Sequence, residues 1–253
     1  MDDIRLDKYI TLALELSRKD AKALIRNKEI TVNGEIIRDS DYKVQENDEI
    51  VYNGNVLSYE EDIYLMMNKP KGYVCSTDDE LHKTVIDLIN MKNRDRLMIV
   101  GRLDIDTTGL LLITNDGSFV HKLTSPSKKI DKKYFVRCDS DFTNDDVISF
   151  EKGVEIYLDQ ETPYICKSSK LEILSDPKEG YITIHEGKYH QVKKMCASVN
   201  KTVVELKRVQ IGLLKLDERL AMGEYRALTD EELELLRWLF IFIVFIVVIV
   251  TLK

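Results

Sequence analysis

The sequence is poor in the residues that build disulfide frameworks and metal sites. Among its 253 residues are four cysteines with no CxxC pair and four histidines with no HExxH pattern. Neither a disulfide framework nor a zinc site is expected, and a reducing compartment suits such a chain. The patterns GxxxxGKS/T and GxGxxG are also absent, so nucleotide-cofactor folds have no support.

A secretory signal is lacking as well. Residues 1–8 are charged, and no apolar core follows them before Glu15. We therefore expect a cytoplasmic protein. With 44% hydrophobic and 32% charged residues, the chain can bury a real core, and its length suggests one or two domains.

Positive charge is scarce overall but concentrated locally. The net charge of −7 argues against a nucleic-acid partner, yet charge distribution matters more than its sum. Residues 121–137 and 188–208 form two basic islands, while acids dominate segments such as 139–146 and 217–234. A single island would be read as a solvated face, whereas two islands on either side of a candidate active site favour a local anionic substrate.

The first sixty residues have the pattern of a small separate domain. Leu6 and Ile10 begin a helical spacing, and Ser17 followed by Asp20 predicts the start of a second helix that ends near Asn27. Asn33-Gly34 predicts a hairpin over residues 30–37, and residues 48–52 predict another strand. Residues 53–55 and 58–62 are expected to link this domain to the next.

One face of the second helix is basic and is a candidate RNA-binding surface. A plain solvated face explains the helical pattern about equally well. The segment SRKDAKALIRNKEITVNG, residues 17–34, resembles the αL-motif RNA-binding module found in a ribosomal small-subunit protein and many RNA-modifying enzymes. The resemblance spans roughly residues 5–52 and implies contacts with RNA phosphates. The side chains expected to make them are Arg18, Lys19, Lys22 and Arg26.

The second domain mixes strands and helices without a regular βαβ repeat. Strands are expected at residues 64–67, 97–100, 110–114, 133–138, 170–174 and 181–185, and helices at 84–88 and 192–199. Asp145-Asp146 lies in a stretch that looks turn-like. The fold class is therefore α+β, with a largely antiparallel mixed sheet.

The segment GRLDIDTTG, residues 101–109, is the strongest candidate for chemistry. Short apolar runs on both sides predict buried strands, and glycines at its ends permit sharp turns. Asp104 would then be held on a rigid loop as a candidate nucleophile, with Arg102 as its electrostatic partner. For an arbitrary RxD segment, a solvated hairpin turn would be the better interpretation.

These nine residues, with Asn115-Asp116-Gly117 shortly after them, resemble the active-site motif of pseudouridine synthases, most closely the RsuA branch. NKPKGYVCSTDD at residues 68–79, where Lys69 and Lys71 could be plain loop residues, and EGKYHQVKKM at residues 186–195 also resemble this family. The whole resemblance covers about residues 5–236. It implies isomerisation of a uridine in small-subunit (16S) ribosomal RNA without any cofactor or metal.

The resemblance also implies individual roles. Asp104 is the catalytic carboxylate, Tyr134 stacks on the base and can transfer a proton, and Lys193 pairs with Asp104. Arg102 would hold a phosphate or the space left by the flipped base, and Leu206 would pack beside the base. His190 is better explained as a structural histidine.

The expected organisation is therefore an αL-motif RNA-binding domain at residues 1–58, a pseudouridine synthase domain at 59–236 and an apolar tail at 237–253. The partner would be ribosomal RNA or a small-subunit assembly particle, and the protein a monomer. A large-subunit target, a magnesium-dependent phosphohydrolase suggested by Asp104-Ile105-Asp106-Thr107, and a non-catalytic RNA-binding assembly factor are the alternatives.

The tail has no counterpart in the family pattern. Its apolar run of about 15 residues is roughly 22 Å long as a helix, short of a hydrocarbon core about 30 Å thick. Its β-branched and aromatic residues suit a strand or an oligomer contact equally well. A membrane anchor is therefore not favoured.

Overall fold

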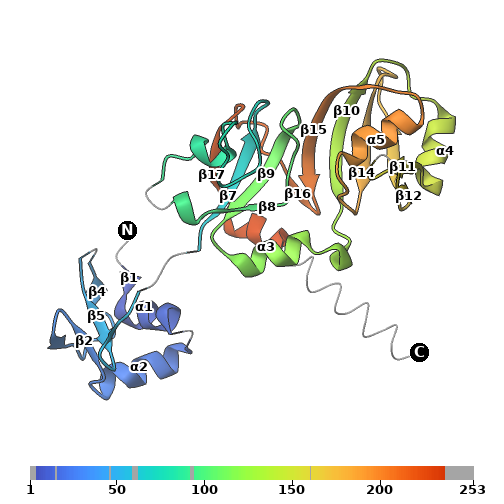
Figure 1. The fold of residues 1–253 in the computed structure, drawn as a ribbon. Coiled ribbons are helices and arrows are strands. Elements are labelled where there is room, and N and C mark those ends of the chain that lie inside the picture. The colour runs from blue at the N-terminus through green and yellow to red at the C-terminus, as the bar shows by residue number, and fades with distance from the viewer. Residues whose placement is uncertain are drawn as a thin grey trace, which may run out of the picture. The chain divides into compact units, whose positions relative to one another are not determined.

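The computed structural model describes residues 4–14, 16–45, 47–58, 62–91, 94–159 and 161–236. The chain divides into two compact units, residues 1–61 and residues 62–253 (Figure 1). The apolar tail assigned to residues 237–253 lies outside the described residues. Among the described residues, no helix is long and apolar enough to cross a membrane.

The first unit packs two helices against short strands. Helix α1 spans Leu6–Ala13 and helix α2 spans Arg18–Arg26. The hydroxyl of Ser17 accepts a hydrogen bond from the Asp20 amide at 3.2 Å, so the predicted cap of α2 is confirmed. Apolar side chains from both helices and the strands, including Leu6, Ile25 and Ile50, form one buried core.

Six strands complete this unit. β1 (Ile4–Arg5) pairs with β4 (Lys43–Val44), and a second sheet has the order β3 (Glu35–Ile36), β2 (Ile30–Val32), β5 (Ile50–Tyr52) and β6 (Asn55–Val56). The prediction that residues 53–55 begin the linker is wrong. Asn53 and Gly54 have φ of 50° and 75° and form the turn of the β5–β6 hairpin, the same Asn-Gly chemistry that joins β2 to β3.

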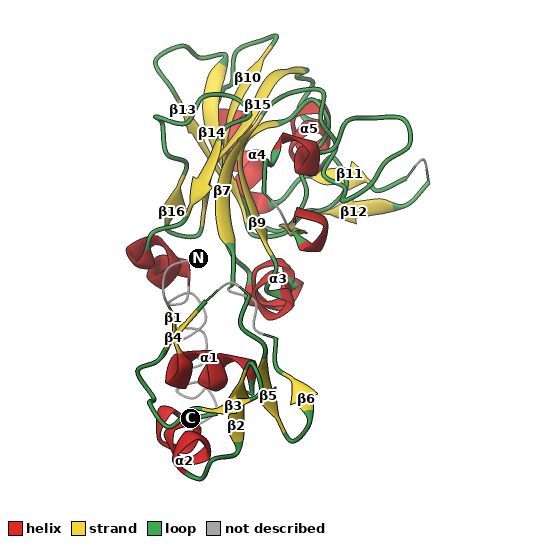
Figure 2. Ribbon diagram, turned by 90° about the vertical axis from the view of Figure 1, so that its left-hand side faces the viewer, coloured by secondary structure: helices red, strands yellow, loops and turns green. Residues whose placement is uncertain are grey.

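The second unit is built on one nine-stranded sheet, seen in Figure 2. Its order is β13, β14, β10, β15, β9, β7, β17, with β16 on β15 and β8 on β9. The strands are β7 (Tyr64–Lys69), β8 (Met98–Val100), β9 (Thr108–Thr114), β10 (Lys132–Cys138), β13 (Lys170–Ile173), β14 (Glu179–Ile184), β15 (Val203–Ile211), β16 (Leu214–Lys215) and β17 (Tyr225–Ala227).

Among the described residues, one pair of neighbouring strands in this sheet is parallel. β15 runs parallel to β9 with the register Lys207 to Thr108 and Arg208 to Gly109, whereas the other strand pairs are antiparallel. The largely antiparallel mixed sheet is therefore confirmed. Gly109, at φ 101°, is needed at this junction because a Cβ there would lie 2.2 Å from the Arg208 carbonyl oxygen.

Helices and a hairpin surround the sheet. They are α3 (Gly117–Thr124), α4 (Asn144–Lys152), α5 (Gln191–Ser198), the 3₁₀ turns η1 (Val85–Leu88), η2 (Arg94–Arg96) and η3 (Pro126–Lys128), and the hairpin β11 (Glu155–Tyr157) with β12 (Pro163–Ile165). Asp145-Asp146 is not turn-like, because both residues form the first turn of α4. The Asp146 carboxylate accepts from the Thr143 amide in a capping box, which the turn interpretation missed.

In Figure 1, helices α4 and α5 and the β11–β12 hairpin lie on the same side of the β10–β14–β15 part of the sheet. Apolar residues of these elements and of the sheet, among them Tyr134, Phe150 and Met195, form one continuous core. This core supports the N-terminal end of α5, which carries the distinctive motif at residues 186–195. The β8–β9 pair is antiparallel, so the doubly wound parallel sheet of the phosphohydrolase alternative is not what holds Asp104.

Candidate active site

The loop between β8 and β9 presents the carboxylate of Asp104. It leaves β8 through Gly101 at φ 73°, and the Thr107 amide donates to the Asp104 carbonyl at 3.1 Å to form a tight turn. Leu103 and Thr107 are buried and anchor the loop on both sides of Asp104. These buried neighbours fix the position of Asp104. Its side chain nevertheless remains 26% exposed.

Lys193 from helix α5 reaches this carboxylate. Its Nζ lies 2.9 Å from Oδ2 of Asp104 and 2.5 Å from Oδ1 of Asp106, so one ammonium bridges two carboxylates. Burial of Lys193 opposes its charged form, but the hydrogen bonds and charges of Asp106 and Asp104 outweigh burial and raise its pKa. The sequence motif suggested the pair with Asp104 and did not include Asp106.

His190 lies on the other side of Asp104. Its Nε2 is 3.6 Å from Oδ1 of Asp104, and its backbone is left-handed at φ 54° where α5 begins. The imidazole of His190 therefore lies in the candidate site, next to the Asp104 carboxylate. A purely structural role, as the sequence suggested, does not explain this position.

Tyr134 and Leu206 lie on neighbouring strands next to the parallel junction. Tyr134 is opposite Arg208 in the β10–β15 register, and Leu206 is opposite Val136. Both side chains are buried in the same core, and the Leu206 carbonyl is 3.4 Å from the hydroxyl of Thr108 at the end of the Asp104 loop. Leu206 therefore lies on the strand next to β9, which follows the loop, and Tyr134 lies one strand further away on β10.

Arg102 does not pair with Asp104. It is exposed, and within the described part of the chain it makes no hydrogen bond or ion pair with that carboxylate. The expected Arg102–Asp104 partnership is therefore absent from the structure. Lys193 takes that place because α5 brings its ammonium to the loop from another part of the fold.

Lys69 contacts the Asp104 loop and was not expected in the site. It was grouped with loop residues, but β7 extends through it, and its side chain is fully buried. Its Nζ donates to the carbonyls of Asp104 at 3.0 Å and Thr107 at 2.9 Å, and to that of Pro70 at 3.0 Å. Burial lowers the pKa of Lys69, although Asp106 and Asp104 oppose that effect. The signal in the sequence was weak: a lysine two residues after the apolar run that ends at Met67.

Arg208 is a second missed residue. Its side chain is 2% exposed, and Nε donates to the Leu110 carbonyl at 2.8 Å, linking β15 to the start of β9. Its Nη2 is buried without a hydrogen-bond partner in the described structure. Burial, followed by repulsion from Arg208, lowers the pKa of nearby Lys132 to about 8.

Several cations of the two basic islands form ion pairs inside the fold. Lys133 pairs with Glu172 at 3.0 Å, Arg137 with Glu179, and Lys201 with Asp146 at 3.1 Å. Tertiary contacts with acids from other segments therefore neutralise part of each island.

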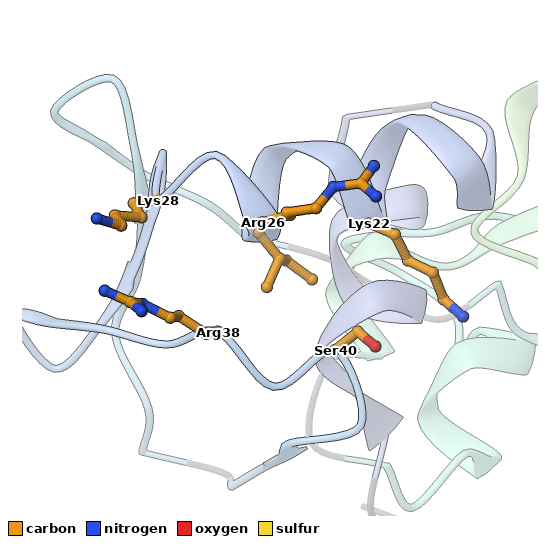
Figure 3. Close-up of a pocket in the computed structure, with 6 residues that line it drawn as sticks. Lys22, Arg26, Lys28, Arg38 and Ser40 are labelled. Atoms are coloured by element: carbon orange, nitrogen blue, oxygen red, sulfur yellow. The ribbon is translucent and has the colours of Figure 1, made fainter.

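The first unit holds a basic pocket of about 440 Å³. Figure 3 shows it, with Lys28 and Arg38 pointing to one side and Lys22 to the other. Of the four predicted RNA-binding cations, Lys22 and Arg26 line the pocket, and Arg18 and Lys19 are exposed on α2 away from its lining. The residues that line the pocket are Lys22, Ile25, Arg26, Lys28, Arg38 and Ser40.

Two acids close in sequence to the pocket residues are engaged elsewhere. Glu29 accepts a hydrogen bond from the Asn27 side chain at 3.1 Å, and Asp41 pairs with Arg5. Among the described residues, Arg26, Lys28 and Arg38 form no ion pair. Of the four cations that line the pocket, Lys22 lies 3.6 Å from the Asp7 carboxylate, and the other three have no internal counter-ion in the described part of the chain, which favours binding of an anion such as a phosphate.

Comparison with known proteins agrees with these features. Residues 63–198 match the RNA pseudouridylate synthase family, and residues 4–50 match the S4 domain family. Ribosomal small subunit pseudouridine synthase A of Salmonella typhimurium and that of Escherichia coli K12 are each 44% identical over 231 residues, covering 91% of this chain and 98% of the relative. An uncharacterized RNA pseudouridine synthase of Aquifex aeolicus is 39% identical over 236 residues, covering 92% and 96%.

A solved structure shows the same fold. The crystal structure of a pseudouridylate synthase superposes with a TM-score of 0.65 at 38% identity, covering 92% of this chain and 99% of that one. Both the family match and the similarity to these relatives extend over the Asp104 loop, Tyr134 and Lys193. The chain therefore belongs to the RNA pseudouridylate synthase family, with an S4 domain before its catalytic domain.

Proposed function

We propose that this enzyme isomerises a uridine of small-subunit ribosomal RNA, with Asp104 as the catalytic carboxylate. The observation that supports the roles of the residues is the ion pair of Asp104 with Lys193 at 2.9 Å on a loop anchored by buried residues. The choice of RNA rests on the relatives named for the ribosomal small subunit. The reaction breaks the bond between C1′ and N1, rotates the uracil and joins C1′ to C5; C5 then loses its proton and N1 gains one, so the product is an isomer of uridine.

The position of each site residue supports a specific role in this reaction. Asp104 reacts with the sugar or the base, or removes a sugar proton, and Lys193 keeps it ionised. Tyr134 and Leu206 hold the uracil: Leu206 lies on β15 beside the end of the Asp104 loop, and Tyr134 lies on the next strand, β10, in the same buried core. Arg102, exposed and unpaired with Asp104, is available for a phosphate or for the space left by the flipped base.

The S4 domain would hold the RNA outside the catalytic domain. The α2 face and the pocket beside it supply cations for backbone phosphates, and Arg26, Lys28 and Arg38 among them have no internal counter-ion within the described residues. The partner is ribosomal RNA, free or in an assembly particle, and the enzyme works as a cytoplasmic monomer.

Mapping of pseudouridine across ribosomal RNA tests this proposal. RNA from cells lacking the protein should have lost one pseudouridine in the small subunit, and purified enzyme should restore it on that RNA. Loss of a large-subunit pseudouridine instead would identify the alternative target. An unchanged map would contradict the proposed function.

A further inference from the structure

Tyr189 and His190 form an aromatic pair beside the catalytic carboxylate. Their rings are stacked with centroids 3.8 Å apart and an interplanar angle of 21°. We call this pair the Tyr189–His190 stack. Because His190 Nε2 lies 3.6 Å from Oδ1 of Asp104, the stack begins at the reactive carboxylate and extends away from it through the tyrosine ring.

The backbone below the stack is held in place by a buried polar network. Gln191 donates from Nε2 to Glu186 at 2.7 Å and accepts from the Lys188 amide at 2.9 Å. Glu186 also accepts from the Tyr164 hydroxyl at 2.7 Å. These bonds close the turn over residues 186–191, and the left-handed conformation of His190 turns its ring toward Asp104. The stack is therefore a supported platform rather than a loose surface pair.

Most of the tyrosine side chain is exposed. Tyr189 is 66% exposed although the His190 ring covers one of its faces. The Lys194 ammonium lies over the tyrosine ring, 5.3 Å from its centroid, and is held by the Leu158 carbonyl at 2.8 Å. An aromatic face with a fixed cation nearby suits a nucleobase together with its phosphate.

We propose that the Tyr189–His190 stack binds the nucleobase of an unpaired nucleotide next to the uridine that is isomerised. The inference rests on the proposed function. Extraction of a uridine from RNA leaves its neighbours without a stacking partner, and proteins that read unpaired RNA replace that partner with an aromatic side chain. The tyrosine face supplies this replacement within reach of Asp104, and stacking on it tolerates any base because every base has a π-face.

Substitutions at Tyr189 separate stacking from other roles. Tyr189→Ala should weaken RNA binding roughly 5- to 150-fold, the range of one lost base–aromatic contact, whereas Tyr189→Phe should bind like the parent. Tyr157→Ala is the matched control, because Tyr157 is also solvent-exposed, at 54%, and lies on β11. Dissociation constants would be measured on a small-subunit ribosomal RNA transcript in the Asp104→Asn background, so that turnover does not intervene.

Steady-state kinetics and fluorescence complete the test. Tyr189→Ala should raise KM and leave kcat within about twofold of the parent. On the mapped RNA, 2-aminopurine placed on either side of the target uridine should be quenched by the parent and by Tyr189→Phe at one of the two positions, and not by Tyr189→Leu. If Tyr189→Ala fails to fold, quenching of 2-aminopurine by the parent protein still tests whether a neighbouring base stacks in the site.

Three results would overturn the proposal. The first is an equal loss of RNA affinity in Tyr157→Ala and Tyr189→Ala. The second is a loss of RNA affinity in Tyr189→Phe as large as that in Tyr189→Ala. The third is a Tyr189→Ala variant in which kcat falls and KM is unchanged. The binding measurement does not depend on turnover. If the enzyme formed no pseudouridine, the proposed function would fail while the comparison of dissociation constants still tested the stack.

Discussion

The ammonium of Lys69 lies 3.0 Å from the main-chain oxygen of Asp104, so a fully buried charge holds the backbone of the residue that we propose as the catalytic carboxylate. The same ammonium binds the Thr107 carbonyl, and thus both ends of the tight turn. Buried cations are costly unless they are hydrogen-bonded, and here the partners are the loop's own carbonyls. The loop and the lysine therefore stabilise each other.

Lys69→Met should lower the free energy of unfolding by about 1–3 kcal/mol, because it leaves buried carbonyl acceptors without a donor. It should also reduce kcat, since the turn that positions Asp104 would loosen. Urea denaturation and steady-state kinetics measure the two effects. Lys71→Met, at an exposed position two residues further along, is the control and should change neither. Parent-like stability in Lys69→Met would contradict this role.

Asp104→Asn should reduce isomerisation by about four orders of magnitude or more, because it keeps the shape of the side chain and removes its charge. Stability and RNA affinity should remain close to those of the parent. A pseudouridine assay and a binding titration on the same RNA check both statements. Turnover near the parent rate would show that another group is the catalytic carboxylate.

Lys193→Met should lower kcat roughly 100-fold, since Asp104 and Asp106 would lose the cation between them. Lys194→Met is the matched control on the same helix, because the Lys194 ammonium binds the Leu158 carbonyl instead. The two kcat values, measured with saturating RNA, make the comparison. Equal values for the two variants would mean that the ion pair with Asp104 is dispensable.

Removal of the cations around the S4 pocket should weaken RNA binding in a salt-dependent way. Arg26→Ala and Arg38→Ala should each reduce the slope of log affinity against log salt by about 0.7–0.9, the effect of one lost phosphate contact. Lys8→Ala removes the same charge from an exposed position on α1 that does not line the pocket, and should leave the slope unchanged. Equal slopes in all variants would place the phosphate contacts elsewhere.

Lys132 should make stability depend on pH. Its pKa is lowered from 10.5 to about 8, first by burial and then by Arg208, with Asp131 acting in the opposite sense. Between pH 8 and 10.5 the unfolded chain therefore holds a proton that the folded chain does not, and the free energy of unfolding rises with pH in this window. Lys132→Met should lack this part of the rise and should be more stable than the parent at pH 7. Parallel stability curves from pH 7 to 10.5 would contradict the expectation.

Local patterns predicted much of the fold. The limits of α2 follow from Ser17 and Asn27, and the β2–β3 hairpin follows from Asn33-Gly34, because capping and turn preferences depend on neighbouring residues. The same Asn-Gly chemistry at residues 53–54 was mistaken for a linker, since the short strand β6 has too few residues to show an alternating pattern.

Some residues of the candidate site were likewise predicted from the sequence, and others were found only in the structure. The sequence by itself determined the family, through motifs long enough to be specific, and with the family came Asp104, Tyr134, Lys193 and Leu206. It could not reveal Lys69, Arg208 or Asp106, nor the platform formed by Tyr189 and His190. Lys69 and Arg208 bind main-chain carbonyls of distant segments, which carry no sequence signal, and the other contacts form where α5 meets the β8–β9 loop. Only the tertiary structure decided which charges were neutralised inside the fold and which remained available to bind RNA. The reason is that an ion pair such as Lys201–Asp146 depends on distance in space and not on position along the chain.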